Sequence, residues 1–116
     1  MKHKKKGRKF GRETGLRKAL IRGLSHHLIV YKKIKTTEAK AKELKPFIEK
    51  IITKAKNDTV ANRRLVFRKI PNKNDVKKIF TEIAPKYKEV NGGYTRIIKT
   101  PPRKIDKAKM AIIEFV

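Results

Sequence analysis

Residues 36–56 have the sequence TTEAKAKELKPFIEKIITKAK, and they contain the clearest structural signal in the chain. Thr36 or Thr37 can cap a helix here, and Glu38 in the first turn suits the positive end of the helix dipole. Pro46 removes one backbone donor, so we expect a kink at that point, although the pattern keeps its phase across it. Apolar residues recur at three- and four-residue spacing, which predicts one long amphipathic helix: Ala41, Leu44, Ile48, Ile51, Ile52 and Ala55.

Three further helices are predicted around this one, over residues 14–28, 59–69 and 74–84. Prolines end the last two, at Pro71 and Pro85. The same periodicity gives the positions that we expect to be buried: Leu16, Ala19, Leu20, Gly23, Leu24, His27 and Leu28 in the first helix, Ala61, Leu65 and Phe67 in the second, and Val76, Ile79, Phe80 and Ile83 in the third.

Strands are expected where β-branched and aromatic residues gather, at residues 29–36, 94–99 and 110–116. Asn91-Gly92-Gly93 predicts a turn before the second strand, because glycine accepts positive φ without strain. The apolar C-terminal segment is expected to pair inside the sheet, since it would otherwise expose its side chains. The resulting fold class is α+β, with about four helices packed on a small sheet of about three strands. We assign residues 13–116 to this single domain.

Residues 1–12 differ from the rest in composition. They contain seven lysines and arginines, no acid, and only Met1 and Phe10 as large apolar residues. Such a segment cannot collapse on itself, so we expect a disordered basic arm. The simpler alternative is a solvated tail that only aids solubility.

The charge balance narrows the class of partner. The chain has 116 residues, with 34 lysines and arginines against 10 acids, and a formal net charge of +24. A polyanion is the natural partner of such a protein. Cysteine is absent, which excludes disulfides and thiolate metal sites. No apolar run reaches the length of a membrane span or a signal peptide, so we expect no membrane partner.

No catalytic constellation is visible in the sequence. Several of the ten acids have structural assignments at helix starts or in i,i+4 pairs with lysines, and none forms an evident acid–base couple. His26 and His27 are adjacent, so on a helix they point in different directions; we expect His27 at the edge of the core and His26 facing outwards. A small ribonuclease built on one of them is the weakest hypothesis, because its partner groups cannot be identified. We expect no enzyme activity, no cofactor, no metal and no small-molecule substrate.

The basic residues occur in the arm, on every helix and in the loop after the second strand. A distribution on several sides suits contact with folded RNA, which proteins recognise largely through backbone and shape. The alternative is a free nucleic-acid-binding protein, such as an RNA chaperone or a DNA-compacting factor. The candidate RNA contacts are Lys2, His3, Lys4, Lys5, Lys6, Arg8, Lys9, Arg12, Arg17, Lys18, Arg22, Arg63, Arg64, Tyr94, Arg96, Arg103 and Lys104.

Several stretches, in order along nearly the whole chain, are shared with one family. They are Gly7-Arg8-Lys9-Phe10-Gly11-Arg12, Arg17-Lys18-Ala19-Leu20, Thr36-Thr37-Glu38-Ala39-Lys40-Ala41-Lys42-Glu43-Leu44, Pro46-Phe47, Glu82-Ile83-Ala84-Pro85-Lys86-Tyr87, Asn91-Gly92-Gly93-Tyr94-Thr95-Arg96 and Met110-Ala111-Ile112-Ile113-Glu114. In these stretches the chain resembles the bacterial-type large-subunit ribosomal protein seventeen.

The resemblance implies a structural component of the ribosome with an α+β fold and no catalytic residues. It implies binding to large-subunit ribosomal RNA, with the N-terminal arm entering the RNA, and contact with neighbouring large-subunit ribosomal proteins. The expected location is the cytoplasmic ribosome, and the sequence leaves an organellar ribosome open.

Overall fold

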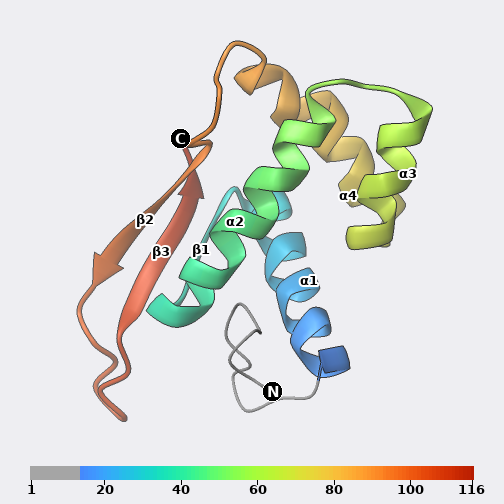
Figure 1. Cartoon of the computed structure of the whole chain (residues 1–116). Coiled ribbons are helices and arrows are strands. Elements are labelled where there is room, and N and C mark those ends of the chain that lie inside the picture. The colour runs from blue at the N-terminus through green and yellow to red at the C-terminus, as the bar shows by residue number, and fades with distance from the viewer. Residues whose placement is uncertain (1–13) are drawn as a thin grey trace, which may run out of the picture.

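The computed structural model describes residues 14–116, so the expected arm at residues 1–12 lies outside the described part of the chain. The element order is α1 (Thr14–Tyr31), β1 (Lys33–Thr37), α2 (Glu38–Ala55), α3 (Val60–Lys69), α4 (Lys73–Lys78), β2 (Thr95–Thr100) and β3 (Met110–Phe115). A π-helical turn (Ile79–Ile83) and a 3-10 turn (Ala84–Tyr87) extend α4. The α+β class with four helices and a three-stranded sheet is confirmed (Figure 1).

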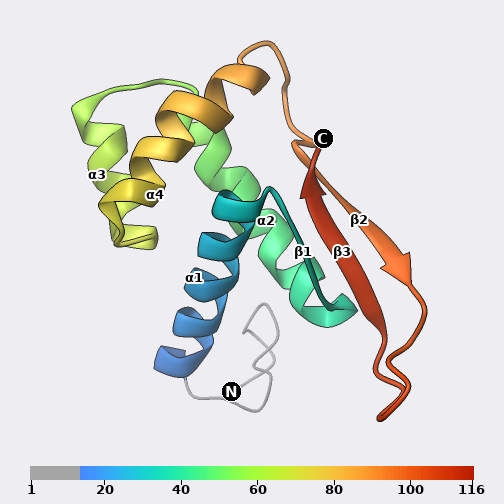
Figure 2. The same cartoon turned by 180° about the vertical axis from the view of Figure 1, so that it is seen from behind.

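The sheet is antiparallel, with the strand order β1-β3-β2. The C-terminal strand β3 lies in the centre, where Ile113 pairs with Ile34 on one side and with Ile97 on the other. The expectation that the apolar C-terminus pairs inside the sheet is therefore confirmed. Helix α2 covers one face, where Ala111 and Ile113 are fully buried. No helix of the described chain covers the opposite face (Figures 1 and 2).

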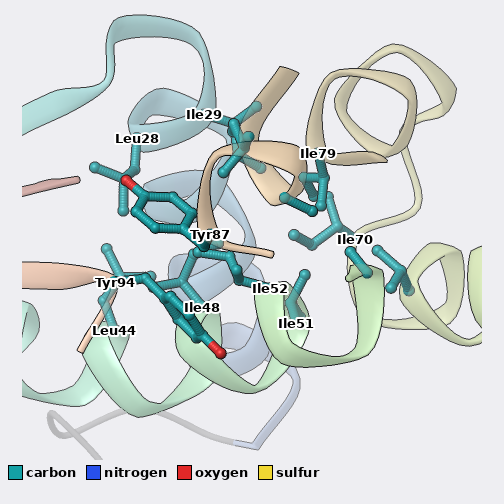
Figure 3. Close-up of a cluster of buried hydrophobic side chains, with 14 of the residues drawn as sticks. Leu28, Ile29, Leu44, Ile48, Ile51, Ile52, Ile70, Ile79, Tyr87 and Tyr94 are labelled. Atoms are coloured by element: carbon teal, nitrogen blue, oxygen red, sulfur yellow. The ribbon is translucent and has the colours of Figure 1, made fainter. Parts of the chain in front are cut away.

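Helix α2 forms as its sequence predicts. The Thr37 hydroxyl accepts a hydrogen bond from the Lys40 amide at 3.3 Å, which caps the first turn. Pro46 lies inside a single continuous helix. All six residues of the expected stripe are buried: Ala41, Leu44, Ile48, Ile51, Ile52 and Ala55. Figure 3 shows α2 side chains meeting Leu28 and Ile29 of α1 in the main core.

Helix α1 departs from its prediction in length and in orientation. It continues to Tyr31, so residues 29–31 are helical rather than part of the expected strand. Lys32, with a φ of 68°, then breaks the helix before β1. The buried face of α1 is formed by Ile21, Ser25, Leu28 and Ile29. Of the seven expected positions only Leu28 is buried. Helix α1 is apolar on two faces, and α2 and α4 pack against the face that contains Ile21 and Ile29 instead of the predicted face.

The sequence pattern also predicts the wrong buried face for α3. Only Val66 is buried, whereas Leu65 and Phe67 are 36% and 40% exposed and Ala61 is exposed as well. Its N-cap is Thr59, whose hydroxyl accepts from the Asn62 amide at 3.1 Å. This ten-residue helix lies at the edge of the fold and packs against α2 and α4 on one side only, so most of its side chains are exposed to solvent.

The segment after α3 buries the four residues that periodicity indicated: Val76, Ile79, Phe80 and Ile83. Its N-cap is Asn72, whose side-chain oxygen accepts from the amides of Asn74 and Asp75. Pro85 does not end the helical run; it stands at the start of the 3-10 turn, where a missing amide donor costs nothing. The Tyr87 hydroxyl then donates to the Val116 carbonyl at 2.8 Å.

The turn before β2 has the predicted backbone. Gly92 and Gly93 have φ values of 132° and 67°, both in the region that favours glycine. Two consecutive residues of this kind redirect the chain from the helical half into the sheet.

Candidate RNA interface

The candidate contacts in the expected arm lie outside the described residues: Lys2, His3, Lys4, Lys5, Lys6, Arg8, Lys9 and Arg12. The remaining candidates lie on α1, on α3, and on or beside the β2–β3 hairpin. The loop of that hairpin and the α3–α4 pair are at opposite ends of the molecule (Figures 1 and 2). The body therefore presents its candidate cations in separate areas rather than in one patch.

On α1, Lys18 is exposed and Arg17 is partly buried. Arg22 crosses to α3, where its Nε donates to the Lys69 carbonyl at 3.2 Å and its Nη2 to the Arg68 carbonyl at 3.4 Å. These carbonyls belong to the last turn of α3, which has no further helical donors to satisfy them. Arg22 therefore has a structural function as a cap, and its guanidinium has other N–H groups left for an anion.

Arg63 and Arg64 on α3 have different surroundings. Arg63 makes a bidentate pair with Asp58, with Nε–Oδ1 and Nη2–Oδ2 distances of 2.7 and 2.9 Å. Its guanidinium also lies 5.0 Å from the centre of the Phe80 ring, in cation–π geometry. Hydrogen bonding to Arg63 lowers the pKa of Asp58, which keeps this carboxylate charged at the start of the helix. Arg64 is exposed.

Arg96 and Arg103 are also ion-paired. On the open face of the sheet, Arg96 Nε lies 3.3 Å from an oxygen of Glu114, its cross-strand partner in the register. In the hairpin loop, Arg103 Nε donates to Asp106 at 3.0 Å, and this hydrogen bond lowers the pKa of the carboxyl group. Lys104 beside it is exposed. Exposed pairs of this kind contribute little to stability.

Tyr94 requires a correction. Its side chain is 1% exposed, and its ring centre lies 5.2 Å from that of Tyr87. Its hydroxyl is 3.0 Å from the Thr53 hydroxyl and accepts from Lys56 Nζ at 3.1 Å. These two hydrogen bonds, that of Thr53 first, lower the pKa of Tyr94. A ring in this position belongs to the core and offers no face to RNA, so Tyr94 is a structural residue in this fold.

The two histidines are placed in the reverse of the expected way. His26 Nδ1 lies 2.7 Å from an oxygen of Asp75, a residue that is only 2% exposed, whereas His27 is exposed. The pair joins α1 to the first turn of α4. It satisfies a buried carboxylate, which is a structural task.

Sequence reasoning missed three cations that lie next to Arg64. Arg68, Lys73 and Lys77 line the same open groove between α3 and α4, whose volume is about 800 Å³. The available signal was the i,i+4 spacing of Arg64 with Arg68 and of Lys73 with Lys77, which puts each pair on one face of its helix. Spacing along one helix does not show that the two pairs face each other across a groove, because that depends on how α3 and α4 pack.

Among residues 14–116, no group of three or more histidine or acidic side chains is placed to hold a metal ion. No helix in that range is long and apolar enough to cross a membrane.

Comparison with known proteins decides the family. The family model described as ribosomal protein L17 matches residues 20–116. The chain belongs to the ribosomal protein L17 family. Three relatives named large ribosomal subunit protein bL17 match the whole chain: that of Fusobacterium nucleatum is 52% identical over its full length, that of Chlorobium phaeobacteroides is 51% identical over 70% of its length, and that of Hydrogenobaculum sp. is 47% identical over 99% of its length.

Family membership confirms the resemblance that the sequence motifs indicated. The L17 family consists of structural proteins of the large ribosomal subunit and not of enzymes. The ion pairs of Arg63, Arg96 and Arg103 and the histidine–aspartate contact are thus read as parts of a scaffold.

Proposed function

We propose that the chain is a structural constituent of the large subunit of the cytoplasmic ribosome, where it binds and stabilises large-subunit ribosomal RNA and contacts neighbouring large-subunit ribosomal proteins. The main observation in support is that this chain, a member of the L17 family, has a net charge of +24 on 116 residues. Its exposed cations lie on α1, on α3 and in the hairpin loop. Each phosphate that such a cation neutralises releases condensed counterions, which supplies affinity without base recognition.

The body offers contacts of two kinds. Lys18, Arg64 and Lys104 are exposed and act as point charges or phosphate clamps. Arg22, Arg63, Arg96 and Arg103 are partly held by the protein, and they present their remaining donors to RNA in fixed orientations. Arg17 is partly buried, and we propose it as a further contact. We propose that the first group supplies affinity and the second group positions the body on the RNA.

The seven cations within residues 1–12 form the other half of the proposal. We propose that this segment acts as an RNA-binding arm and that residues 13–116 act as the body. The seven cations and the absence of acids fit a segment that neutralises phosphate, so we propose that the arm contributes charge.

The test compares the full chain with a variant that lacks residues 2–12, by measuring affinity for large-subunit RNA across a salt series. The truncated chain is expected to bind more weakly and with a shallower log–log salt slope, because each lost phosphate contact removes about 0.7 to 0.9 from the slope. Its melting temperature is expected to stay the same. A second variant keeps the length and replaces the seven cations with glutamine, which separates charge from chain length. An unchanged slope in both variants would show that the segment is only a solvated tail.

The free nucleic-acid-binding alternative is tested by cosedimentation. A ribosomal constituent stays with large subunits through a high-salt wash, whereas a free chaperone or compaction factor is released. Incubation of the purified chain with labelled RNA also tests the ribonuclease hypothesis, and we expect the RNA to remain intact.

A further inference from the structure

We propose that the groove between α3 and α4 binds an unpaired nucleotide of the RNA, with the base against Phe67 and the flanking phosphates between two rows of cations. The inference rests on the proposed function and adds to it a site for single-stranded RNA. The groove has a volume of about 800 Å³ and lies between two helices that pack side by side (Figures 1 and 2).

The first argument is the aromatic ring in the groove. Phe67 is 40% exposed, and Val60, about two turns earlier on the same face of α3, is 67% exposed. The nearby Phe80 is only 4% exposed and is covered by the guanidinium of Arg63. Phe67 is therefore the ring that a ligand can reach, while Phe80 and Arg63 stiffen the wall behind it. A nucleobase stacks on such a ring whatever its sequence, because every base has a π face.

The second argument is uncompensated charge on both walls. Arg64 and Arg68 line the α3 side, and Lys73 and Lys77 line the α4 side. No acid lines the groove, and none of these four cations forms an ion pair with an acid among residues 14–116. Arg63 differs in this respect, since its pair with Asp58 neutralises it. The four cations can therefore bind an anion that carries several charges along its length, such as a nucleic-acid backbone.

The combination favours unpaired RNA over paired RNA. In an A-form duplex the bases stack on each other, so phosphates are available but no base face is free. In a loop or bulge the bases can be splayed out and stacked on aromatic side chains. Phosphate contacts on two walls, with an accessible ring on the α3 wall, therefore match a short unpaired segment. An acidic peptide would match the charges too, and the experiments below are designed to reveal one.

The first experiment compares two alanine variants of the full chain, Phe67→Ala and Leu65→Ala. Phe67→Ala removes the stacking surface, and Leu65→Ala is the matched control, because Leu65 is similarly exposed on the same helix but does not line the groove. We expect roughly tenfold weaker binding to large-subunit RNA for Phe67→Ala and unchanged binding for Leu65→Ala. Melting curves check that both variants fold. Equal affinities for the two variants would overturn the inference.

The second experiment uses the absence of cysteine from the chain, so that one introduced thiol can carry an iron chelate that cleaves nearby RNA. Val60→Cys places the chelate in the groove, and Ile105→Cys places it in the hairpin loop, where the side chain is 96% exposed. In assembled subunits we expect the groove probe to cleave at an unpaired segment. The bases of that segment should be protected from dimethyl sulfate in wild-type subunits and reactive in Phe67→Ala subunits.

The outcomes separate this inference from the proposed function. Cleavage from Ile105→Cys with none from Val60→Cys, or cleavage from Val60→Cys confined to duplex RNA, would overturn the nucleotide site and leave ribosomal RNA binding intact. A photo-crosslinker at position 60 that joins a protein instead of RNA would also overturn it. No cleavage from either probe would overturn the proposed function itself.

Discussion

Helices α1 and α2 have the same length, 18 residues, and very different relations to their own sequences. In α2 every position of the expected apolar stripe is buried. In α1 the expected stripe is mostly exposed, with Leu16 at 57%, and the buried face is the one that contains Ile21 and Ile29. The lysines and glutamates of α2 leave only one face that can enter a core. Helix α1 has apolar residues on two faces, so periodicity alone offers two solutions and packing selects one.

The largest loss of stability among these tests is expected for a substitution in the buried stripe of α2. Ile48 is fully buried, so Ile48→Ala should lower the free energy of unfolding by about 2–5 kcal/mol, through lost burial and the cavity left behind. Leu16→Ala on the exposed face of α1 is the control and should change it by less than about 0.5 kcal/mol. Urea denaturation measures both. A large loss for Leu16→Ala would mean that the exposed face of α1 is covered in the folded protein.

The next largest contrast is expected between two glycines, one in the turn before β2 and one within α1. Gly93 has a φ of 67°, where a β-branched residue is strained, so Gly93→Val should cost about 1–3 kcal/mol. Gly23 lies within α1 and an added Cβ there meets nothing within 4 Å, so Gly23→Ala should stabilise the protein by about 0.5–1 kcal/mol. Thermal melting should therefore move in opposite directions for the two variants. Shifts of the same sign would contradict the backbone assignment at one of them.

Substitutions of the two histidines of α1 test which face of the helix is buried. His26→Gln should lower the free energy of unfolding by about 1–2 kcal/mol, because it disturbs the hydrogen bond to the buried Asp75. His27→Gln should have almost no effect, since His27 is exposed. Neither variant should change RNA integrity or subunit assembly. If His27→Gln proved the more destabilising, α1 would be rotated relative to the structure.

Surface arginines are expected to give the smallest effects on stability. Arg96→Ala breaks an exposed pair with Glu114 and should cost at most about 1 kcal/mol. Arg22→Ala removes the cap on α3 and should cost a similar amount. Both should weaken binding to large-subunit RNA, which a filter-binding titration measures. An Arg96→Ala variant that lost stability and bound RNA normally would assign Arg96 to the fold alone.

Much of the fold could be predicted because its signals are local. The stripe of α2, the four buried positions from Val76 to Ile83, the glycine turn and the apolar strand β3 each follow from spacing or backbone preference within a few residues. The charge balance likewise pointed to a polyanion, since a sum over the chain needs no coordinates.

Only tertiary contacts could decide the rest. Which face of α1 is buried depends on where α2 and α4 lie. The burial of Tyr94 depends on its packing near α2, where Thr53 lies 41 positions earlier in the chain. The state of each cation is also set in space: Asp58 neutralises Arg63, while Arg64, one residue later, faces an open groove with cations of α4 across it. Local sequence specifies how a segment folds, because backbone propensity and periodicity act over a few residues. Contacts between elements, such as that of His26 with Asp75, are specified only when the segments pack, because the two partners are far apart in the chain.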